Sequence, residues 1–120
     1  MIIRLPWPPN ELSPNWTGKL RKKIRAKKQY KDLCGWELIG QGVKALTFKP
    51  DQIFIRYTFL PPGKYAYDKD NLQARMKYAQ DMIAQRLGVD DRIFEPLRPI
   101  IEKSQGKPGY VLVEIKETEE

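Results

Sequence analysis

Four segments of the chain carry the apolar pattern of β-strands. The clearest is Gln52 to Leu60, which is β-branched and aromatic and alternates apolar with polar residues at a period of two. Ile2 to Leu5 and Tyr110 to Ile115 follow the same pattern over shorter runs. Ile93 to Lys103 is also strand-like, but Pro96 and Pro99 interrupt it. Proline cannot donate to a strand ladder, so this segment is predicted to be an edge strand or irregular.

Two segments carry apolar residues at helical spacing instead. The first runs from about Lys19 to Gly42, where Gly40 and Gly42 supply the stop. The second runs from about Asn71 to Leu87, and Gly88 ends it. Its apolar positions form one stripe that predicts a buried face, namely Leu72, Met76, Ala79, Ile83 and Leu87.

Taken in order, these elements read β-α-β-α-β-β and predict a mixed α/β fold with a small mixed sheet and two helices. The turn-forming sequence SQGKPG separates the last two strands, which favours an antiparallel hairpin at the end of the chain. The 120 residues contain no repeat and no internal linker. We therefore expect residues 1–120 to form a single domain.

The composition of the chain limits the reactions, metal sites and partners that it can have. The net charge is +7, which is common in proteins that bind nucleic acid. The chain has no histidine and one cysteine, Cys34, so histidine-based acid–base chemistry, a structural zinc site within one chain and an internal disulfide are excluded. No apolar run is long enough to span a membrane, and no signal peptide is evident. We expect a cytoplasmic protein without a membrane partner.

The motif YDKDNLQARMK, residues 67 to 77, concentrates acid in this basic chain. One interpretation is structural: Asp70 caps the following helix and Asp68 is a solvated loop charge, which is the commoner role of such a pair. The other is that Asp68 and Asp70 hold a metal ion. A calcium loop of the EF-hand type does not fit, because its sixth position would be Gln73 rather than glycine.

Two further features favour the metal interpretation. On one continuous helix, at about 100° per residue, Lys77 would lie within about 20° of Asp70, on the face opposite the apolar stripe. A second acid pair, Asp90 and Asp91, directly follows the helix, and a chain return would bring it near the first pair. Clustered carboxylates facing a phosphodiester require a divalent cation, and oxygen ligands suit Mg²⁺ or Mn²⁺.

A basic segment, KLRKKIRAKK, precedes this motif at residues 19 to 28. Charge runs are usually solvated, but seven cations without an acid destabilise a helix start unless an anion screens them. A DNA backbone would supply that anion. The segment, here called the basic arm, carries Lys19, Arg21, Lys22, Lys23, Arg25, Lys27 and Lys28.

Three motifs together resemble the RusA family of Holliday-junction resolvases, which phages and prophages often encode. They are LPWPPN at 5 to 10, DKDNLQ at 68 to 73 and DD at 90 and 91, and they occur in family order over most of the chain. The resemblance implies a RusA-like fold and a homodimeric, Mg²⁺-dependent endonuclease. Such an enzyme nicks four-way DNA junctions symmetrically in recombination and repair, without a nucleotide cofactor.

Carried over residue by residue, the resemblance implies catalytic metal ligands at Asp68, Asp70 and Asp91, with Asp90 as an additional ligand. Asn71 matches the motif asparagine. The family lysine falls on Ala74, and we expect Lys77 to replace it, with Arg75 as the competitor. Lys69, Asn71 and Arg75 join the basic arm as expected DNA contacts. The alternatives are a non-catalytic DNA-binding module of the same fold and a nucleotide-sugar transferase that uses Asp-x-Asp.

Overall fold

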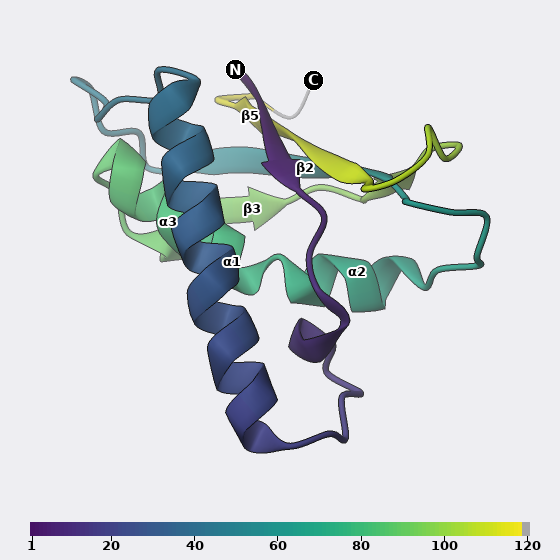
Figure 1. Cartoon of the computed structure of the whole chain (residues 1–120). Helices are drawn as coiled ribbons and strands as arrows, with labels where there is room; N and C mark the ends of the chain where they lie inside the picture. Colours follow the sequence, from purple (N-terminus) through teal and green to yellow (C-terminus); the bar gives the residue numbers. More distant parts are fainter. Residues whose placement is uncertain (119–120) are drawn as a thin grey trace.

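A computed structural model describes residues 1–118, which form one mixed α/β domain (Figure 1). The strands are β1 (Ile2–Pro6), β2 (Ile53–Leu60), β3 (Phe94–Pro96), β4 (Ile100–Ile101) and β5 (Tyr110–Lys116). The helices are α1 (Leu20–Gly40), α2 (Lys69–Arg75) and α3 (Lys77–Leu87), with short 3₁₀ helices η1 (Asn10–Leu12) and η2 (Asp91–Ile93). The predicted fold class is confirmed, and so is each predicted strand.

The sheet has the order β1-β5-β2-β3, and β4 also pairs with β2. β5 runs antiparallel to both β1 and β2, whereas β3 and β4 run parallel to β2. The predicted closing hairpin is therefore wrong, because β2 lies between β5 and the segment that precedes it. That segment is broken by Pro96 and Pro99 and lies at the edge, as expected.

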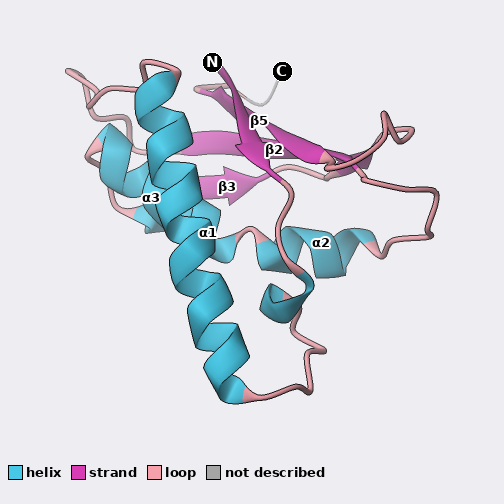
Figure 2. Ribbon diagram, in the orientation of Figure 1, coloured by secondary structure: helices cyan, strands magenta, loops and turns pink. Residues whose placement is uncertain are grey.

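The core lies between one face of the sheet and the helices (Figure 2). β2 contributes Ile53, Ile55, Tyr57 and Phe59, which are buried because the strand period turns all four toward the helices. The predicted stripe of the second helical segment is buried in full. Gly35 lets α1 approach α3, because an added Cβ would lie 3.2 Å from Cε of Met82.

The second helical segment is divided, which the sequence did not predict. α2 ends at Arg75 and α3 begins at Lys77, and Met76 lies between them with φ −82° and ψ 0°. The amide of Met76 donates to the carbonyl of Gln73, a tighter bond than the α-helical one. The angular relation expected between Asp70 and Lys77 on one straight helix is therefore wrong. Gly88 ends α3 with φ 74°, as predicted.

Side chains of α1 and of its C-terminal cap occupy part of the outer edge of β1, at Arg4 and Pro6. The side-chain amide of Gln41 accepts from the Arg4 amide at 2.8 Å and donates to the Arg4 carbonyl at 2.6 Å. The Tyr30 hydroxyl donates to the Pro6 carbonyl at 2.8 Å. α1 is thus fixed to the sheet by polar contacts as well as by the core. Among residues 1–118, no helix combines the length and the apolarity needed to cross a membrane.

Candidate functional site

The first acid pair begins α2. Asp68, not Asp70, is the N-cap: its Oδ1 accepts from the amides of Asp70 at 2.8 Å and Asn71 at 3.1 Å. Both carboxylates are exposed, and neither forms an ion pair within the described part of the chain. Oδ2 of Asp68 and both oxygens of Asp70 can therefore bind a cation. Mg²⁺ usually takes one or two carboxylates and keeps several waters, so the donor set fits it.

Asn71 and Arg75 point into the protein rather than toward solvent. The Asn71 Nδ2 donates to Ser13 Oγ at 2.7 Å. Arg75 is buried, and it donates to Asn71 Oδ1 at 3.0 Å and to Asn10 Oδ1 at 2.9 Å. The expectation that Arg75 contacts DNA is wrong for this arrangement, because its guanidinium is enclosed by the N-terminal loop. Lys69 and Lys77 are exposed, as a contact to phosphate requires.

The second acid pair, Asp90 and Asp91, lies at the end of α3, and Asp81 of α3 lies close to it. Asp90 caps η2 and forms an ion pair with Arg92 at 2.9 Å, and these bonds lower the pKa of Asp90 to about 2. The pKa of the Asp91 carboxyl is raised, first by partial desolvation and then by its contacts with Asp90 and Asp81. The three acids line a shallow hollow of about 360 Å³ together with Gln85 and Val89.

Asp81 was not among the predicted site residues. One signal was available: it follows Lys77 by four residues, which places both on one face of α3. Ser13 and Asn10 were also missed as partners of α2, and no local pattern indicates them because each lies more than 55 residues away in sequence from its partner.

The two acid groups lie at opposite ends of a crossover. β2 and β3 are parallel, so the chain leaves the C-terminal end of β2, passes through α2 and α3, and returns to the N-terminal end of β3. Asp68 and Asp70 follow β2, whereas Asp90 and Asp91 precede β3, and the eight residues of β2 span about 26 Å. Figure 1 shows the start of α2 and the end of α3 on opposite sides of the domain.

The expected return that would bring the two pairs together therefore does not occur within one chain. Among residues 1–118, no three acidic or cysteine side chains are placed to hold one metal ion together. Each group offers oxygen donors separately.

The basic arm comprises Lys19, the N-cap of α1, and the first part of the helix, which projects beyond the sheet (Figure 1). Its cations are exposed except for Lys23, which is half-buried, and none forms an ion pair within the described residues. Lys27 Nζ lies 4.7 Å from the ring centre of Tyr78, a cation–π contact. η1 packs against both α1 and α2, so it joins the arm to the helix that carries Asp68 and Asp70.

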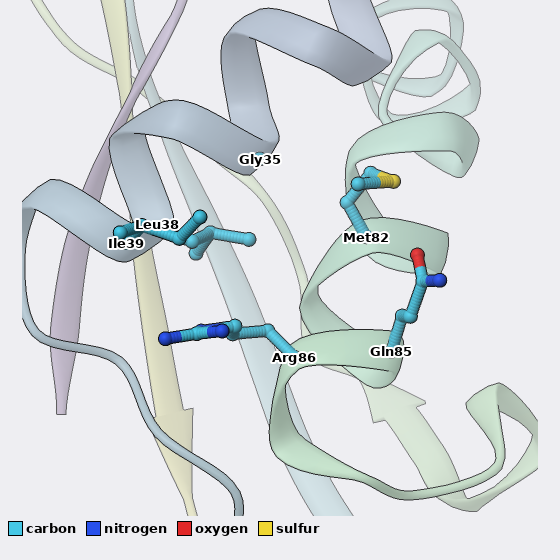
Figure 3. A pocket seen from close by; sticks show the side chains of 6 residues that line it. All are labelled: Gly35, Leu38, Ile39, Met82, Gln85 and Arg86. Carbon is cyan, nitrogen blue, oxygen red and sulfur yellow. The ribbon is translucent and has the colours of Figure 1, made fainter.

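A second hollow lies between α1 and α3 (Figure 3). It has a volume of about 320 Å³ and is lined by Gly35, Leu38, Ile39, Met82, Gln85 and Arg86. Arg86 reaches along the hollow and donates Nε to the carbonyl of Val43 at 2.7 Å. The hollow contains no carboxylate or nucleophile. Nearby Cys34 is fully buried, which raises its pKa to about 12 and leaves the thiol unreactive.

Comparison with known proteins identifies a relative. An uncharacterized protein of Xylella fastidiosa is 32% identical over 121 residues, which cover 94% of this chain and 74% of the relative. The chain belongs to the same family as this protein. No protein-family model matches it. The relative's description names no activity, so the functional argument depends on the chain's own residues.

Proposed function

We propose that the chain is a divalent-cation-dependent endodeoxyribonuclease that resolves four-way DNA junctions. The observation that carries the proposal is the acid pair at the start of α2. A chain with 22 basic and 15 acidic residues leaves Asp68 and Asp70 exposed, with no basic partner among the described residues. Free carboxylates in a strongly basic protein suit a metal ion that mediates contact with phosphate. The resemblance of three motifs to the RusA family supports the same activity.

In the proposed reaction, Asp68 and Asp70 hold Mg²⁺, and the basic arm binds the DNA backbone. When bound, the ion supplies an activated water and stabilises charge on the reacting phosphate. Oδ1 of Asp68 accepts from two amides, so Oδ2 would be the oxygen free to bind the ion. Lys77 offers an exposed ammonium group near the start of α3 for the charge that develops in the transition state.

In the proposed enzyme, Asp91 acts from a second copy of the chain. Asp91 lies at the far end of the crossover from Asp70. The two carboxylates of one chain are therefore too far apart to act at the same phosphate. A twofold dimer can place Asp91 of the partner subunit beside Asp68 and Asp70, and symmetry then creates two equivalent sites. Two sites also match the two strands that are cut in a four-way junction.

The first test compares a labelled four-way junction with a matched linear duplex, each with and without Mg²⁺. We expect paired nicks in the junction that require Mg²⁺, and little cleavage of the duplex. Tight junction binding without cleavage would instead indicate a non-catalytic DNA-binding module. Binding of a nucleotide sugar in place of DNA would indicate a transferase.

The second test asks whether the site is shared between subunits. Asp70→Asn and Asp91→Asn chains are each expected to be inactive, and they are unfolded, mixed and refolded together. If sites are shared, each mixed dimer keeps one intact site, so equal mixing restores about a quarter of the wild-type sites. If each chain contains a whole site, no mixed dimer is active, and the proposed role of the second copy is wrong.

A further inference from the structure

Arg75 is a buried cation that forms no salt bridge among the described residues. The residue is 8% exposed, and burial lowers the pKa of its guanidinium, whereas charge interactions with Tyr67 and Glu11 act in the opposite direction. The group stays charged. Its acceptors are neutral: Asn71 Oδ1 at 3.0 Å, Asn10 Oδ1 at 2.9 Å and the carbonyl of Pro8 at 3.5 Å. No carboxylate of the described chain lies within ion-pair distance. Burying a charge is costly, so this arrangement requires a compensating role.

The contacts of Arg75 lead to the first acid pair through Asn71. The Asn71 side chain is held at both ends, because Oδ1 accepts from Arg75 and Nδ2 donates to Ser13 Oγ at 2.7 Å. The backbone amide of the same residue donates to Oδ1 of Asp68 at 3.1 Å. Arg75 thus acts on the turn that carries the acids, although it does not touch either carboxylate.

The other side of this network is the N-terminal loop. Asn10 and Pro8 accept from Arg75, and Ser13, itself 8% exposed, accepts from Asn71 and from the amide of Asn15 at 3.1 Å. The loop is therefore bound to both ends of α2. Since a helix of seven residues has little stability of its own, its first turn depends on such contacts for a fixed position.

We propose that Arg75 is a positioning residue for the metal site: through Asn71 it fixes the turn that carries Asp68 and Asp70 against the N-terminal loop. The two carboxylates then meet the cation with little rearrangement. This inference rests on the proposed function, and it assigns Arg75 a part different from that of a phosphate-binding cation. Partners that orient metal ligands typically change metal affinity by about 10- to 100-fold when removed.

The test uses the full chain with Arg75→Met, which removes the charge and all donors, and Arg75→Lys, which keeps the charge and some donors. Asn10→Ala is a milder variant, because it removes one acceptor at an exposed residue and leaves the core intact. Arg86→Met is the matched control, since Arg86 also donates Nε to an uncharged oxygen, the Val43 carbonyl, but far from Asp68.

Two quantities are measured: the Mg²⁺ concentration for half-maximal junction cleavage, and hydrogen exchange of the Asp70 and Asn71 amides. Arg75→Met should raise the half-maximal Mg²⁺ concentration about tenfold or more and accelerate exchange of the two amides. Both effects should be smaller in Arg75→Lys and Asn10→Ala. Arg86→Met should leave both unchanged. An unchanged Mg²⁺ requirement in Arg75→Met overturns the inference, whatever its melting temperature.

If the wild-type chain does not cleave, the proposed function fails, and calorimetric titration with Mg²⁺ replaces the cleavage measurement. Weaker Mg²⁺ binding and faster amide exchange in Arg75→Met would then still support the positioning role. Unchanged binding or unchanged exchange would overturn it.

Discussion

Replacing Asp68 separates its two possible roles, because the cap and the metal site depend on different properties of the side chain. The cap needs only an oxygen that accepts from the amides of Asp70 and Asn71. Asparagine provides that oxygen and is as good an N-cap as aspartate, whereas alanine is not. A metal ligand needs the negative charge, which asparagine lacks. Asp68→Asn should therefore keep the fold and lose the activity.

The expected magnitudes follow from these contacts. Asp68→Ala should lower the free energy of unfolding by about 1 kcal/mol, the usual cost of a lost cap. For 120 residues, at about 2.1 cal/mol/K of unfolding entropy per residue, this corresponds to a melting temperature lower by about 4 °C. Asp68→Asn should change the melting temperature by less than about 2 °C. Both variants should cleave at least about a hundredfold more slowly, because metal stabilisation of the transition state is worth several kcal/mol.

The assay combines thermal unfolding followed by circular dichroism, without metal, and single-turnover cleavage of a labelled junction over a range of Mg²⁺ concentrations. Junction binding without Mg²⁺ serves as the control and should be unchanged or tighter in Asp68→Asn. If Asp68→Asn cleaves at the wild-type rate with the same Mg²⁺ dependence, Asp68 is only a cap and the metal assignment is refuted.

Three further predictions concern other parts of the chain. Asp91→Asn should raise the melting temperature at pH 7 without metal, because desolvation and then the contacts with Asp90 and Asp81 raise the pKa of Asp91, so its ionised form destabilises the fold. This gain should disappear well below about pH 4, where the carboxyl is protonated in both the folded and the unfolded state; a gain that persists there would contradict destabilisation by the ionised carboxylate. Alanine at the arm residues Lys22, Lys23 and Arg25 should weaken binding to every DNA shape and flatten the salt dependence of affinity, and an unchanged salt slope would mean that the arm faces solvent. Lys77→Ala should slow cleavage about a hundredfold with little change in junction affinity, and a wild-type rate would exclude Lys77 as the cation at the phosphate.

The sequence predicts the strands and the buried faces because these depend on local periodicity. The alternation in β2 and the stripe along the second helical segment match the structure residue by residue. The break at Met76 was not predictable, since neither proline nor glycine marks it. The cap was assigned to Asp70 because either aspartate of an Asp-x-Asp pair fits the capping pattern, and the backbone geometry of Asp68 decides between them.

Long-range pairing accounts for the remaining differences. The separation of Asp70 from Asp91 follows from the parallel pairing of β2 with β3, which no residue near either aspartate specifies. The burial of Arg75 depends likewise on Asn10 and Pro8 of a distant loop. Local pattern thus sufficed to predict strands and buried faces, whereas the spatial grouping of the candidate site residues depends on pairing that the sequence does not specify.

The side-chain bonds along the outer edge of β1 restrict how copies of this protein can associate. An exposed strand edge ordinarily accepts a strand from another molecule, which is the usual start of sheet-to-sheet aggregation. Here Gln41 occupies the amide and carbonyl of Arg4, Tyr30 occupies the carbonyl of Pro6, and proline has no amide to offer. At the opposite edge, β3 and β4 are short, Pro96 ends β3, and Pro99 precedes β4. Strand addition is therefore disfavoured along most of both edges, and we expect a dimer of this chain to form through helices, loops or the open face of the sheet.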